Sequence, residues 1–382
     1  MDLSQLRKEI DEIDEQLIPL LIKRMKVAEN VAEYKVENNI PVLNASREQE
    51  ILDKVEAKCG KYGNTIKTIY SATMDASRAL QHKIIGGGSE LRSAVEGAER
   101  NKKLRITANG APIACQGVEG AYSETAGRAI FPDSPIQFYK QFENVFEAVN
   151  QRKAKFGIIP VENSTAGSVH EAYDLIMKYR FYVVGSYNLK VEHCLCAKPD
   201  TKYENIENVY SHPQALSQCS AFIKNFDFTG INYSNTAAAA EFVAKSDKNN
   251  IAAICSEAAA KKYGLKILRK SIQNITNNTT RFIVISKELV IDEDAQKISL
   301  IFSAPHTTGS LYRVLGRFSM SGLNLTKLES RPVANGKFDY LFYVDILGNV
   351  NDDETIDLLC ALSDELDEFT FLGNYHEICT EK

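Results

Sequence analysis

The chain has 382 residues, more than one typical hydrophobic core accommodates, so we expect two or three domains. Its hydrophobic content of 44% and charged content of 25% are ordinary for a soluble globular protein. The net charge of −5 argues against nonspecific nucleic-acid binding, which needs a basic surface, although a local pocket can still be positive.

The cysteines and the apolar runs narrow the class further. The eight cysteines are scattered, and only Cys194 and Cys196 lie close together, so none has the spacing of a zinc site. We therefore expect reduced thiols, no metal and a cytoplasmic location. Residues 1–9 contain no apolar signal-peptide core and no run is long enough to span a bilayer, so neither secretion nor a membrane partner is expected.

Residues 1 to about 85 have a helical pattern. From Ser4, the predicted N-cap, to about Val36, apolar side chains recur at three- and four-residue steps; the first are Leu3, Leu6, Ile10, Ile13, Leu17, Leu20 and Leu21. Pro19 is expected to kink this helix, and residues 38–41 close it. Two more helices are predicted at about 45–58 and 64–85, and the glycines at 86–88 fit a helix C-cap and hinge. Because the first helix is too long to bury its apolar stripe on two shorter partners, we predict a dimer through this domain.

Basic residues in this segment fall into two groups by helical phase. Arg24 and Lys35 are eleven residues apart and share one helix face. Arg7 lies about 25 Å from Arg24 along the helix and about 100° around it, so the two cannot serve one small site within a chain. Arg78 and most of the lysines are expected on a solvated face.

Residues 89–110 read as a linker or an extra helix, and residues 112–286 alternate strands with helices. The predicted strands are 113–115, 156–160, 182–189, 206–210, 251–254 and 282–286. This alternation predicts an α/β domain with a largely parallel sheet. Polar residues stand at several predicted helix starts, where free N–H groups attract carboxylates; they are Ser123, Asn163, Ser164, Ser211, His212 and Thr236.

Residues 297–382 read strand, helix, strand, strand, helix, strand. The pieces are 298–303, 311–321, 323–332, 338–346, 354–366 and 369–378. This βαββαβ order is typical of the ferredoxin-like fold.

Short motifs carry a resemblance to a known family. The segments Gly117–Ser123, Pro160–Ser164, Ser211–Leu216, Asn277–Phe282 and Glu329–Pro332 resemble prephenate dehydratase followed by an ACT domain, and Leu6–Asp11 resembles the opening of an all-helical chorismate mutase. Apart from about 86–110, the chain is similar to the bifunctional chorismate mutase/prephenate dehydratase family. The resemblance implies an all-α mutase domain (1–88), a linker (89–110), a two-lobed α/β dehydratase domain like a periplasmic binding protein (111–288) and a ferredoxin-like ACT domain (296–382).

The resemblance also implies roles for residues in the mutase domain. It rearranges chorismate to prephenate without a cofactor, by holding the substrate in a chair-like conformer. Lys35 and Gln81 would donate to the ether oxygen, the arginines would clamp carboxylates, and Glu48 would bind the ring hydroxyl. Arg7 would reach into the partner's site. The positions implied to contact substrate are Arg7, Arg24, Lys35, Asn44, Arg47, Glu48, Ser77 and Gln81, with Asn44 standing where relatives often carry aspartate.

For the dehydratase domain, the resemblance implies loss of hydroxide and carbon dioxide from prephenate to give phenylpyruvate. Thr280 would assist the departing oxygen, helped by a neighbour or water because a threonine hydroxyl is a weak acid. Arg281 would either bind a carboxylate or buttress the site, and Phe282 would pack in the core. His212 is either a general acid or a structural residue at a helix start.

In the last domain, the resemblance implies a regulatory site for phenylalanine between paired domains. Its residues are Gly309, Ser310, Leu311, Glu329, Ser330 and Arg331, with Ser310 replacing the usual alanine. Two alternatives stay open: a dehydratase whose helical domain serves only assembly, and a non-enzymatic small-molecule sensor. The oligomer order and the preference between prephenate and arogenate are not determined by the sequence.

Overall fold

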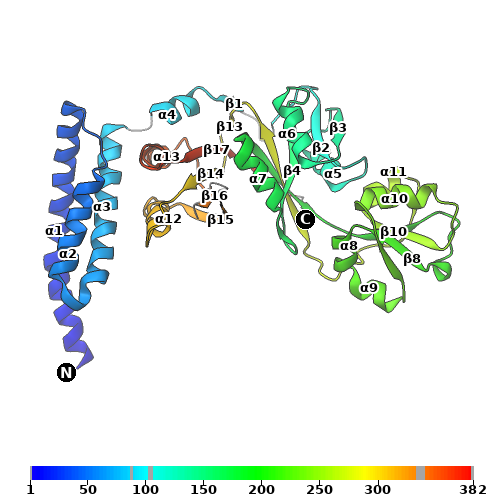
Figure 1. Cartoon of the computed structure of the whole chain (residues 1–382), viewed down its shortest axis with the longest axis horizontal. Coiled ribbons are helices and arrows are strands. Elements are labelled where there is room, and N and C mark those ends of the chain that lie inside the picture. The colour runs from blue at the N-terminus through cyan, green and yellow to red at the C-terminus, as the bar shows by residue number, and fades with distance from the viewer. Residues whose placement is uncertain (1, 87–88, 102–105, 333–339, 380–382) are drawn as a thin grey trace. The chain divides into compact units, whose positions relative to one another are not determined.

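Two units make up the computed structural model, one of residues 1–97 with 300–371 and the other of residues 98–299 with 372–382. The structure describes residues 2–86, 89–101, 106–332 and 340–379 (Figure 1). The segments predicted as first and last domains thus contribute to the same unit, except for residues 296–299 and the final residues from 372 onward. Gly87 and Gly88 of the predicted hinge lie outside the described residues. In the described ranges, no helix is both long enough and apolar enough to cross a membrane.

Three helices form the N-terminal segment: α1 (Leu3–Asn38), α2 (Ala45–Lys58) and α3 (Gly63–Ile85), with a 3₁₀ turn at Gly60–Tyr62. Helix α1 continues through Pro19 and ends where Asn39 turns left-handed at φ 52°, which frees the chain to reverse. The predicted N-cap Ser4 is wrong: the cap is Asp2, and Ser4 lies inside the helix, where its hydroxyl donates to the Asp2 carboxylate. Gly86 ends α3 at φ 71°, as predicted for a C-cap glycine.

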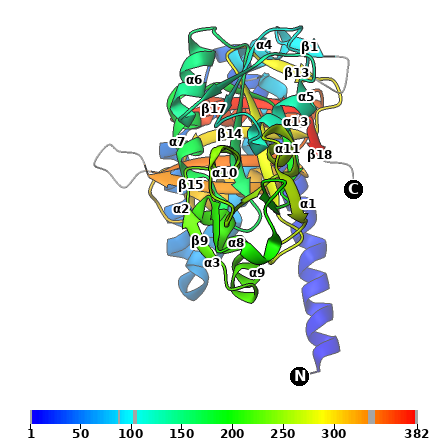
Figure 2. The same ribbon diagram turned by 90° about the vertical axis from the view of Figure 1, so that its right-hand side faces the viewer.

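The apolar stripe of α1 is largely exposed. Only Ala28 and Ala32 of this helix are buried, whereas Leu3, Ile10 and Ile13 are about 60% exposed. Figures 1 and 2 show the first turns of α1 extending past the hairpin of α2 and α3. Among the described residues of this unit, therefore, none buries the N-terminal half of this stripe.

The C-terminal segment has the βαββαβ order that its sequence pattern predicts. Its elements are β14 (Lys297–Ser303), α12 (Ser310–Met320), β15 (Asn324–Pro332), β16 (Tyr340–Leu347), α13 (Asp353–Glu365) and β17 (Phe369–Tyr375). The four strands form one sheet in the order β15-β16-β14-β17. Helices α12 and α13 both contact α3, and α13 also contacts α4 (Ser89–Glu96).

The second unit contains two mixed sheets rather than the largely parallel sheet that we predicted. The first sheet has the order β18-β6-β12-β4-β2-β3, with β5 beside β4; the second has the order β11-β7-β10-β8-β9. The prediction fails because β12 returns to the first sheet antiparallel to both its neighbours, β4 and β6. The chain crosses from the first sheet to the second through residues 191–193 and back through 270–278, so the unit has two lobes joined by two segments.

The strands of the first lobe are β2 (Ile113–Gln116), β3 (Ile136–Tyr139), β4 (Phe156–Asn163), β5 (Gly167–Ser168), β6 (Tyr182–Lys190), β12 (Thr279–Ser286) and β18 (Glu377–Cys379). Its helices are α5 (Tyr122–Ile130), α6 (Phe142–Asn150) and α7 (His170–Tyr179). A small parallel pair, β1 (Glu99–Asn101) with β13 (Val290–Asp292), belongs to the same unit.

The second lobe contains β7 (Cys194–Ala197), β8 (Asn208–Ser211), β9 (Thr229–Asn232), β10 (Ile251–Cys255) and β11 (Lys266–Arg269). Its helices are α8 (Pro213–Gln218), α9 (Ser220–Asn225), α10 (Thr236–Lys245) and α11 (Glu257–Lys262), with a 3₁₀ turn at Tyr203–Asn205. Each lobe has its own buried apolar cluster, around Phe156 and Val284 in the first and around Ala240 and Ile251 in the second.

The predicted last strand, 369–378, is two strands in the structure. The strand β17 ends at Tyr375. After His376, the separate strand β18 pairs in parallel with β6. Glu377 on β18 contacts Arg281 at 3.3 Å and Lys297 at 2.6 Å, so charge pairing fixes this end of the chain where the apolar pattern alone suggested continuation.

Candidate active sites

A cavity of about 430 Å³ lies among the three N-terminal helices. Seven of the eight predicted mutase residues line it, namely Arg24, Lys35, Asn44, Arg47, Glu48, Ser77 and Gln81. Arg7 does not line it and is exposed on α1, as its phase and distance along the helix predict. The cavity lining therefore contains several basic side chains and one carboxylate, that of Glu48. Apolar side chains, including Val31 and Met74, complete the lining.

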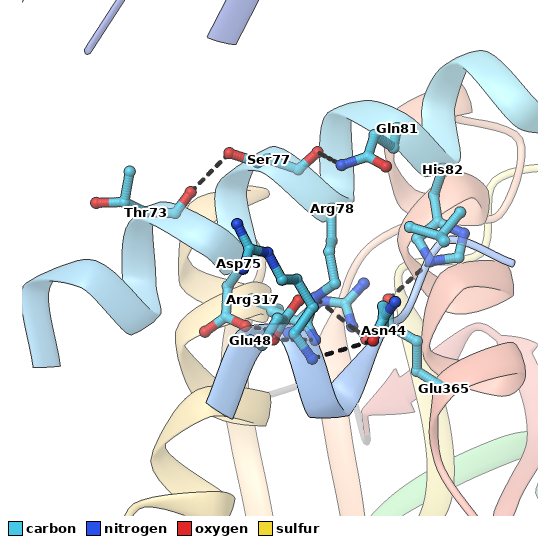
Figure 3. Close-up of polar contacts among 12 residues, drawn as sticks. Asn44, Glu48, Thr73, Asp75, Ser77, Arg78, Gln81, His82, Arg317 and Glu365 are labelled. Carbon is cyan, nitrogen blue, oxygen red and sulfur yellow. Dashed lines mark hydrogen bonds and ion pairs between the residues drawn. The ribbon is translucent and has the colours of Figure 1, made fainter. Parts of the chain in front are cut away.

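Hydrogen bonds hold several of these side chains in place. Arg24 donates to the Ser77 hydroxyl and, at 3.1 Å, to the Thr73 carbonyl oxygen. The Lys35 ammonium donates to the Val42 carbonyl oxygen at 2.6 Å. Figure 3 shows the Ser77 carbonyl oxygen accepting from the Gln81 amide at 3.3 Å. The donors around this cavity are thus oriented before any ligand enters, which lowers the cost of reorganisation on binding.

Asn44 has a structural part as well. Its side-chain oxygen caps α2 by accepting from the Arg47 backbone N–H at 3.0 Å. An N-cap asparagine or aspartate serves this bond equally well, so the departure from the aspartate of related proteins preserves the helix start.

Arg78 corrects the sequence analysis, which placed it on a solvated face. It is only 8% exposed and lines the cavity, where its guanidinium contacts Glu48 at 3.1 Å and also pairs with Asp75 (Figure 3). Helical phase alone could not reveal this, because α12 and α13, which contact α3, lie more than 200 residues away in the sequence.

Burial shapes the charge state of the acidic and basic groups here. It raises the pKa of Glu48 above its ordinary value, despite the opposing charge of Arg78. Burial also lowers the pKa of Lys35, partly offset by Glu48.

The second unit contains a cleft of about 380 Å³. Residues from both lobes and from the crossing segments line it, including Gln116, Tyr122, Ser123, Asn163, His193, His212, Gln214, Gln218, Asn235, Thr236, Thr280 and Phe282. Of the described residues in this lining, none is Asp, Glu, Lys or Arg. Its polarity comes from amides, hydroxyls and two imidazoles.

Thr280 lies at the N-terminal end of β12, where it pairs with Asn163 on β4. The Asn163 side-chain N–H donates to the Thr280 hydroxyl oxygen at 2.9 Å and to the Asn278 side-chain oxygen at 2.8 Å. The Asn163 side-chain oxygen in turn accepts from the backbone N–H groups of Thr165 and Ala166, at 3.1 and 3.0 Å. Because Asn163 supplies the proton in its bond to Thr280, the threonine can direct its own proton elsewhere.

Three predicted dehydratase residues do not line the cleft. Ser211 is fully buried and donates to the Ile254 carbonyl oxygen at 2.6 Å, while Ser164 accepts from the Thr279 backbone N–H at 2.9 Å. Arg281 follows Thr280 on the strand, so its side chain points to the opposite face, where it donates to the Tyr375 hydroxyl at 2.8 Å. The structure thus places the Arg281 side chain on the face of the strand opposite to Thr280.

His212 lines the cleft and begins a helix at the same time. Its Nδ1 accepts from the Gln214 backbone N–H at 3.3 Å, so the neutral ring carries its proton on Nε2. Partial burial lowers the pKa of His212. Near neutral pH the ring is therefore an uncharged donor toward the cleft.

The sequence analysis missed a polar network that crosses between the lobes. His193 is buried, with Nε2 at 2.9 Å from the Gln218 side-chain oxygen and Nδ1 at 3.2 Å from the Tyr122 hydroxyl. Gln218 also accepts from the Asn278 amide at 3.1 Å, which links the network to Asn163 and Thr280. Burial lowers the pKa of His193, although the bond to Gln218 opposes this. No short motif marks His193 or Gln218; only the crossing of the chain brings them to Thr280.

The predicted effector residues lie at two places in the C-terminal segment. Gly309, with φ 80°, precedes α12, and Ser310 lines a cavity of about 360 Å³ with residues 304–308, Tyr340 and Phe342. Glu329, Ser330 and Arg331 lie on β15, which is an edge strand, and do not line this cavity. No cluster of His, Cys, Asp or Glu suited to a metal ion occurs in the part of the chain that the structure describes.

A charged pocket within a helical bundle and a neutral cleft between two α/β lobes define a protein with two separate sites for small polar molecules. A family model for type II chorismate mutase matches residues 6–82, and one for prephenate dehydratase matches residues 113–290.

Known proteins match over most of the chain. The bifunctional chorismate mutase/prephenate dehydratase of Enterobacter agglomerans is 30% identical over 98% of this chain and 95% of its own length. An arogenate dehydratase/prephenate dehydratase of Arabidopsis thaliana is 38% identical over 69% of this chain and 71% of its own length.

Solved structures agree with these matches. A prephenate dehydratase of Arthrobacter aurescens in complex with L-Phe has a TM-score of 0.65 at 26% identity, covering 69% of this chain and 89% of that one. A protein described as a quorum quenching acylase, GqqA, also has a TM-score of 0.65, at 29% identity, over 70% of this chain and 98% of that one. The chain belongs to the bifunctional chorismate mutase/prephenate dehydratase family. It joins an isomerase that converts chorismate to prephenate with a lyase that converts prephenate to phenylpyruvate.

Proposed function

We propose that the cavity of the helical bundle is the mutase site and that each site takes one residue, Arg7, from a second copy of the chain. The main support for this proposal is where the eight predicted mutase residues lie. Seven of them line one cavity, whereas Arg7 lies on the exposed part of α1. The exposed apolar stripe of α1 supplies a surface for pairing. A homodimer would bury this stripe and complete two sites.

Inside this site, charge and hydrogen bonds would fix the reactive conformer of chorismate. Arg24 and Arg47 would bind its carboxylates, and Lys35 with Gln81 would donate to the ether oxygen as negative charge develops there. Glu48 would bind the ring hydroxyl. The reaction is a rearrangement, so none of these groups has to exchange a proton with the substrate.

For the dehydratase site, we propose that Thr280 donates its proton to the departing hydroxyl of prephenate, which leaves as water while the ring carboxylate leaves as carbon dioxide and its bonding electrons complete the aromatic ring. A proton from solvent then restores the Thr280 hydroxyl. The Asn163 N–H at 2.9 Å would stabilise the charge that develops on the Thr280 oxygen, and His212 lies on the same cleft as a neutral donor. The substrate carboxylates would be held by Ser123 and Thr236 at the starts of α5 and α10. Because no acidic side chain is among the described lining residues, the cleft offers no counterion for the ammonium of arogenate, which favours prephenate.

We further propose that the C-terminal segment is an ACT domain that binds phenylalanine and inhibits the enzyme. Its support is the βαββαβ order and the likeness to a prephenate dehydratase whose structure contains L-Phe. Phenylalanine would contact Gly309, Ser310 and Leu311 and, across paired domains, Glu329, Ser330 and Arg331. Inhibition would follow if the effector binds one conformation better than the other. A cytoplasmic location fits the eight cysteines, all of which are free thiols.

One assay tests these proposals together. Purified protein is given chorismate alone, and chorismate loss and phenylpyruvate formation are followed with and without phenylalanine. Phenylpyruvate formation that phenylalanine suppresses is expected. Accumulated prephenate would refute the dehydratase proposal, and untouched chorismate would favour the sensor alternative.

Mixing two variants tests the shared mutase site. Arg7→Ala and Arg24→Ala proteins should each lack mutase activity. After subunit exchange, half of the dimers are hybrids with one intact site of two, so roughly a quarter of the wild-type activity should return. No recovery after verified exchange would contradict a site built from two chains.

A further inference from the structure

A cluster of buried charges joins the mutase helices to the C-terminal segment within the first unit. Its members come from four helices and are Glu48 on α2; Asp75, Arg78 and His82 on α3; Arg317 on α12; and Glu365 on α13. Figure 3 shows them converging beside the mutase cavity. In this cluster, a single side chain is the intermediate between Glu48 and a carboxylate of the C-terminal segment.

Arg78 is that intermediate. One terminal nitrogen of its guanidinium donates to Glu48 at 3.1 Å, the other pairs with Asp75, and its Nε faces Glu365 at 3.8 Å. Glu365 is itself held from two sides, because His82 Nε2 lies 2.7 Å from one of its oxygens and Arg317 donates to the other at 2.7 Å. The arginine therefore connects Glu48 in the cavity with a carboxylate of α13.

Burial makes this arrangement sensitive to loss of one partner. Arg78 is 8% exposed and Arg317 is 4% exposed, and Glu365 lies between the two guanidinium groups. Burial alone would raise the pKa of Glu365, but the bond with His82 and the charges of Arg317 and Arg78 outweigh it and lower the pKa. Without this carboxylate, two buried cations would face each other, and Arg78 would shift relative to Glu48.

The cavities show that this cluster is the wall of the mutase site. Glu48 and Arg78 line the mutase cavity and also line a second cavity of about 290 Å³, to which Arg317 and Glu365 contribute. A displacement of Arg78 in the second cavity would therefore also move the wall of the mutase cavity.

We propose that Glu365 is a positioning residue of the chorismate mutase reaction: through Arg78 it holds Glu48 in place, so the C-terminal segment completes the mutase site. This inference rests on the proposed role of the helical cavity and of Glu48. It makes the mutase site dependent on a segment outside the region that the mutase family model matches, residues 6–82.

The test compares Glu365→Gln with Glu354→Gln in the full chain. Glu354 lies on the same helix and pairs with Lys83 of α3 at 3.6 Å. Both side chains are more than half exposed, so this ion pair contributes little to stability. In Glu365→Gln, kcat/KM for chorismate should fall between about tenfold and a hundredfold, mainly through a higher KM, because Glu48 contacts substrate before and during the reaction. Glu354→Gln should leave both activities unchanged, as should Glu365→Gln for supplied prephenate.

An unchanged KM for chorismate in Glu365→Gln would overturn the proposal. If kcat and dehydration then fall together, the pattern reports a smaller folded fraction rather than a displaced Glu48. A failure of Arg24→Ala to impair the mutase would instead refute the proposed site, so the two failures are distinguishable.

A double variant tests whether Glu365→Gln acts only by leaving Arg317 without a counterion. In Arg317→Met with Glu365→Met, the buried cation and its counterion disappear together, so no unpaired charge is left. The KM for chorismate should stay high, because Arg78 still lacks the carboxylate that faces its Nε. A return to the wild-type KM would show that the single variant failed only through the unpaired Arg317, and would refute the positioning role.

Discussion

The two proposed sites of this chain offer an anionic substrate different contacts. The helical cavity is lined by Arg24, Lys35, Arg47 and Arg78, whereas the described lining of the dehydratase cleft contains no Asp, Glu, Lys or Arg. A rearrangement needs a substrate held in one conformation, for which bidentate charged contacts are well suited. Loss of hydroxide needs a proton delivered to one oxygen, for which a fixed network of neutral donors suffices. The difference predicts that variants in one site leave the other working.

Thr280→Ala is expected to have the largest effect. It removes the proposed proton donor, so dehydration of supplied prephenate should fall by on the order of a thousandfold, while conversion of chorismate to prephenate stays unchanged. Thr280→Ser retains the hydroxyl and should keep much of the activity. Phenylpyruvate formation measures both variants, and a loss of only a few fold in the alanine variant would contradict the assignment.

Arg24→Ala should affect the other site by about a hundredfold to a thousandfold. Its guanidinium is held by Ser77 and Thr73 and would contact a carboxylate of chorismate, so its removal takes away a fixed donor. Chorismate consumption is the measurement, with dehydration of supplied prephenate in the same preparation as the control. Equal losses in both reactions would indicate unfolding rather than a local effect.

Much of this organisation could be predicted from the sequence. The approximate extents of the three N-terminal helices and the βαββαβ order follow from periodicity, whereas seven of the mutase-cavity residues follow from the resemblance to the family. The antiparallel course of β12 and the separate strand β18 could not be predicted, because they depend on which distant strands pair. Arg78 was misplaced for a similar reason, since its burial depends on helices encoded at the other end of the chain. His193 and Gln218 belong to no local pattern and reach Thr280 only through the crossing of the two lobes.

Asn163→Asp tests whether the neutral cleft works through its amide donors. The aspartate keeps the shape and the acceptor that binds the 165–166 backbone, but it loses the N–H that donates to Thr280. Dehydration should fall by roughly tenfold to a hundredfold, because a developing charge on Thr280 would face a carboxylate instead of a donor. The mutase reaction should be unaffected. Unchanged dehydration would remove Asn163 from the proposed mechanism.

Added salt should separate the two sites without any mutation. Charged contacts that are partly exposed weaken as ionic strength rises, whereas hydrogen bonds between fixed neutral groups and a carboxylate respond less. The KM for chorismate should therefore rise more than the KM for prephenate between low salt and about 0.5 M sodium chloride. Equal rises would mean that long-range attraction, rather than the pocket cations, sets the salt response.

The smallest effect concerns the stability of the dehydratase unit and His193. Burial lowers the pKa of this histidine below its ordinary value of 6.5, so the unfolded chain binds more protons than the folded one in mild acid. The stability that comes from the neutral ring is present above pH 6.5 and is lost as the pH falls through the folded pKa. Lowering the pH from 7.5 to 5.5 should thus cost about 1 kcal/mol that His193→Gln does not lose. Hydrogen exchange of β6 and β12 peptides across a urea series measures this unit alone. The same pH dependence in both proteins would assign the acid sensitivity to other groups and leave His193 with a packing role in the network that reaches Thr280.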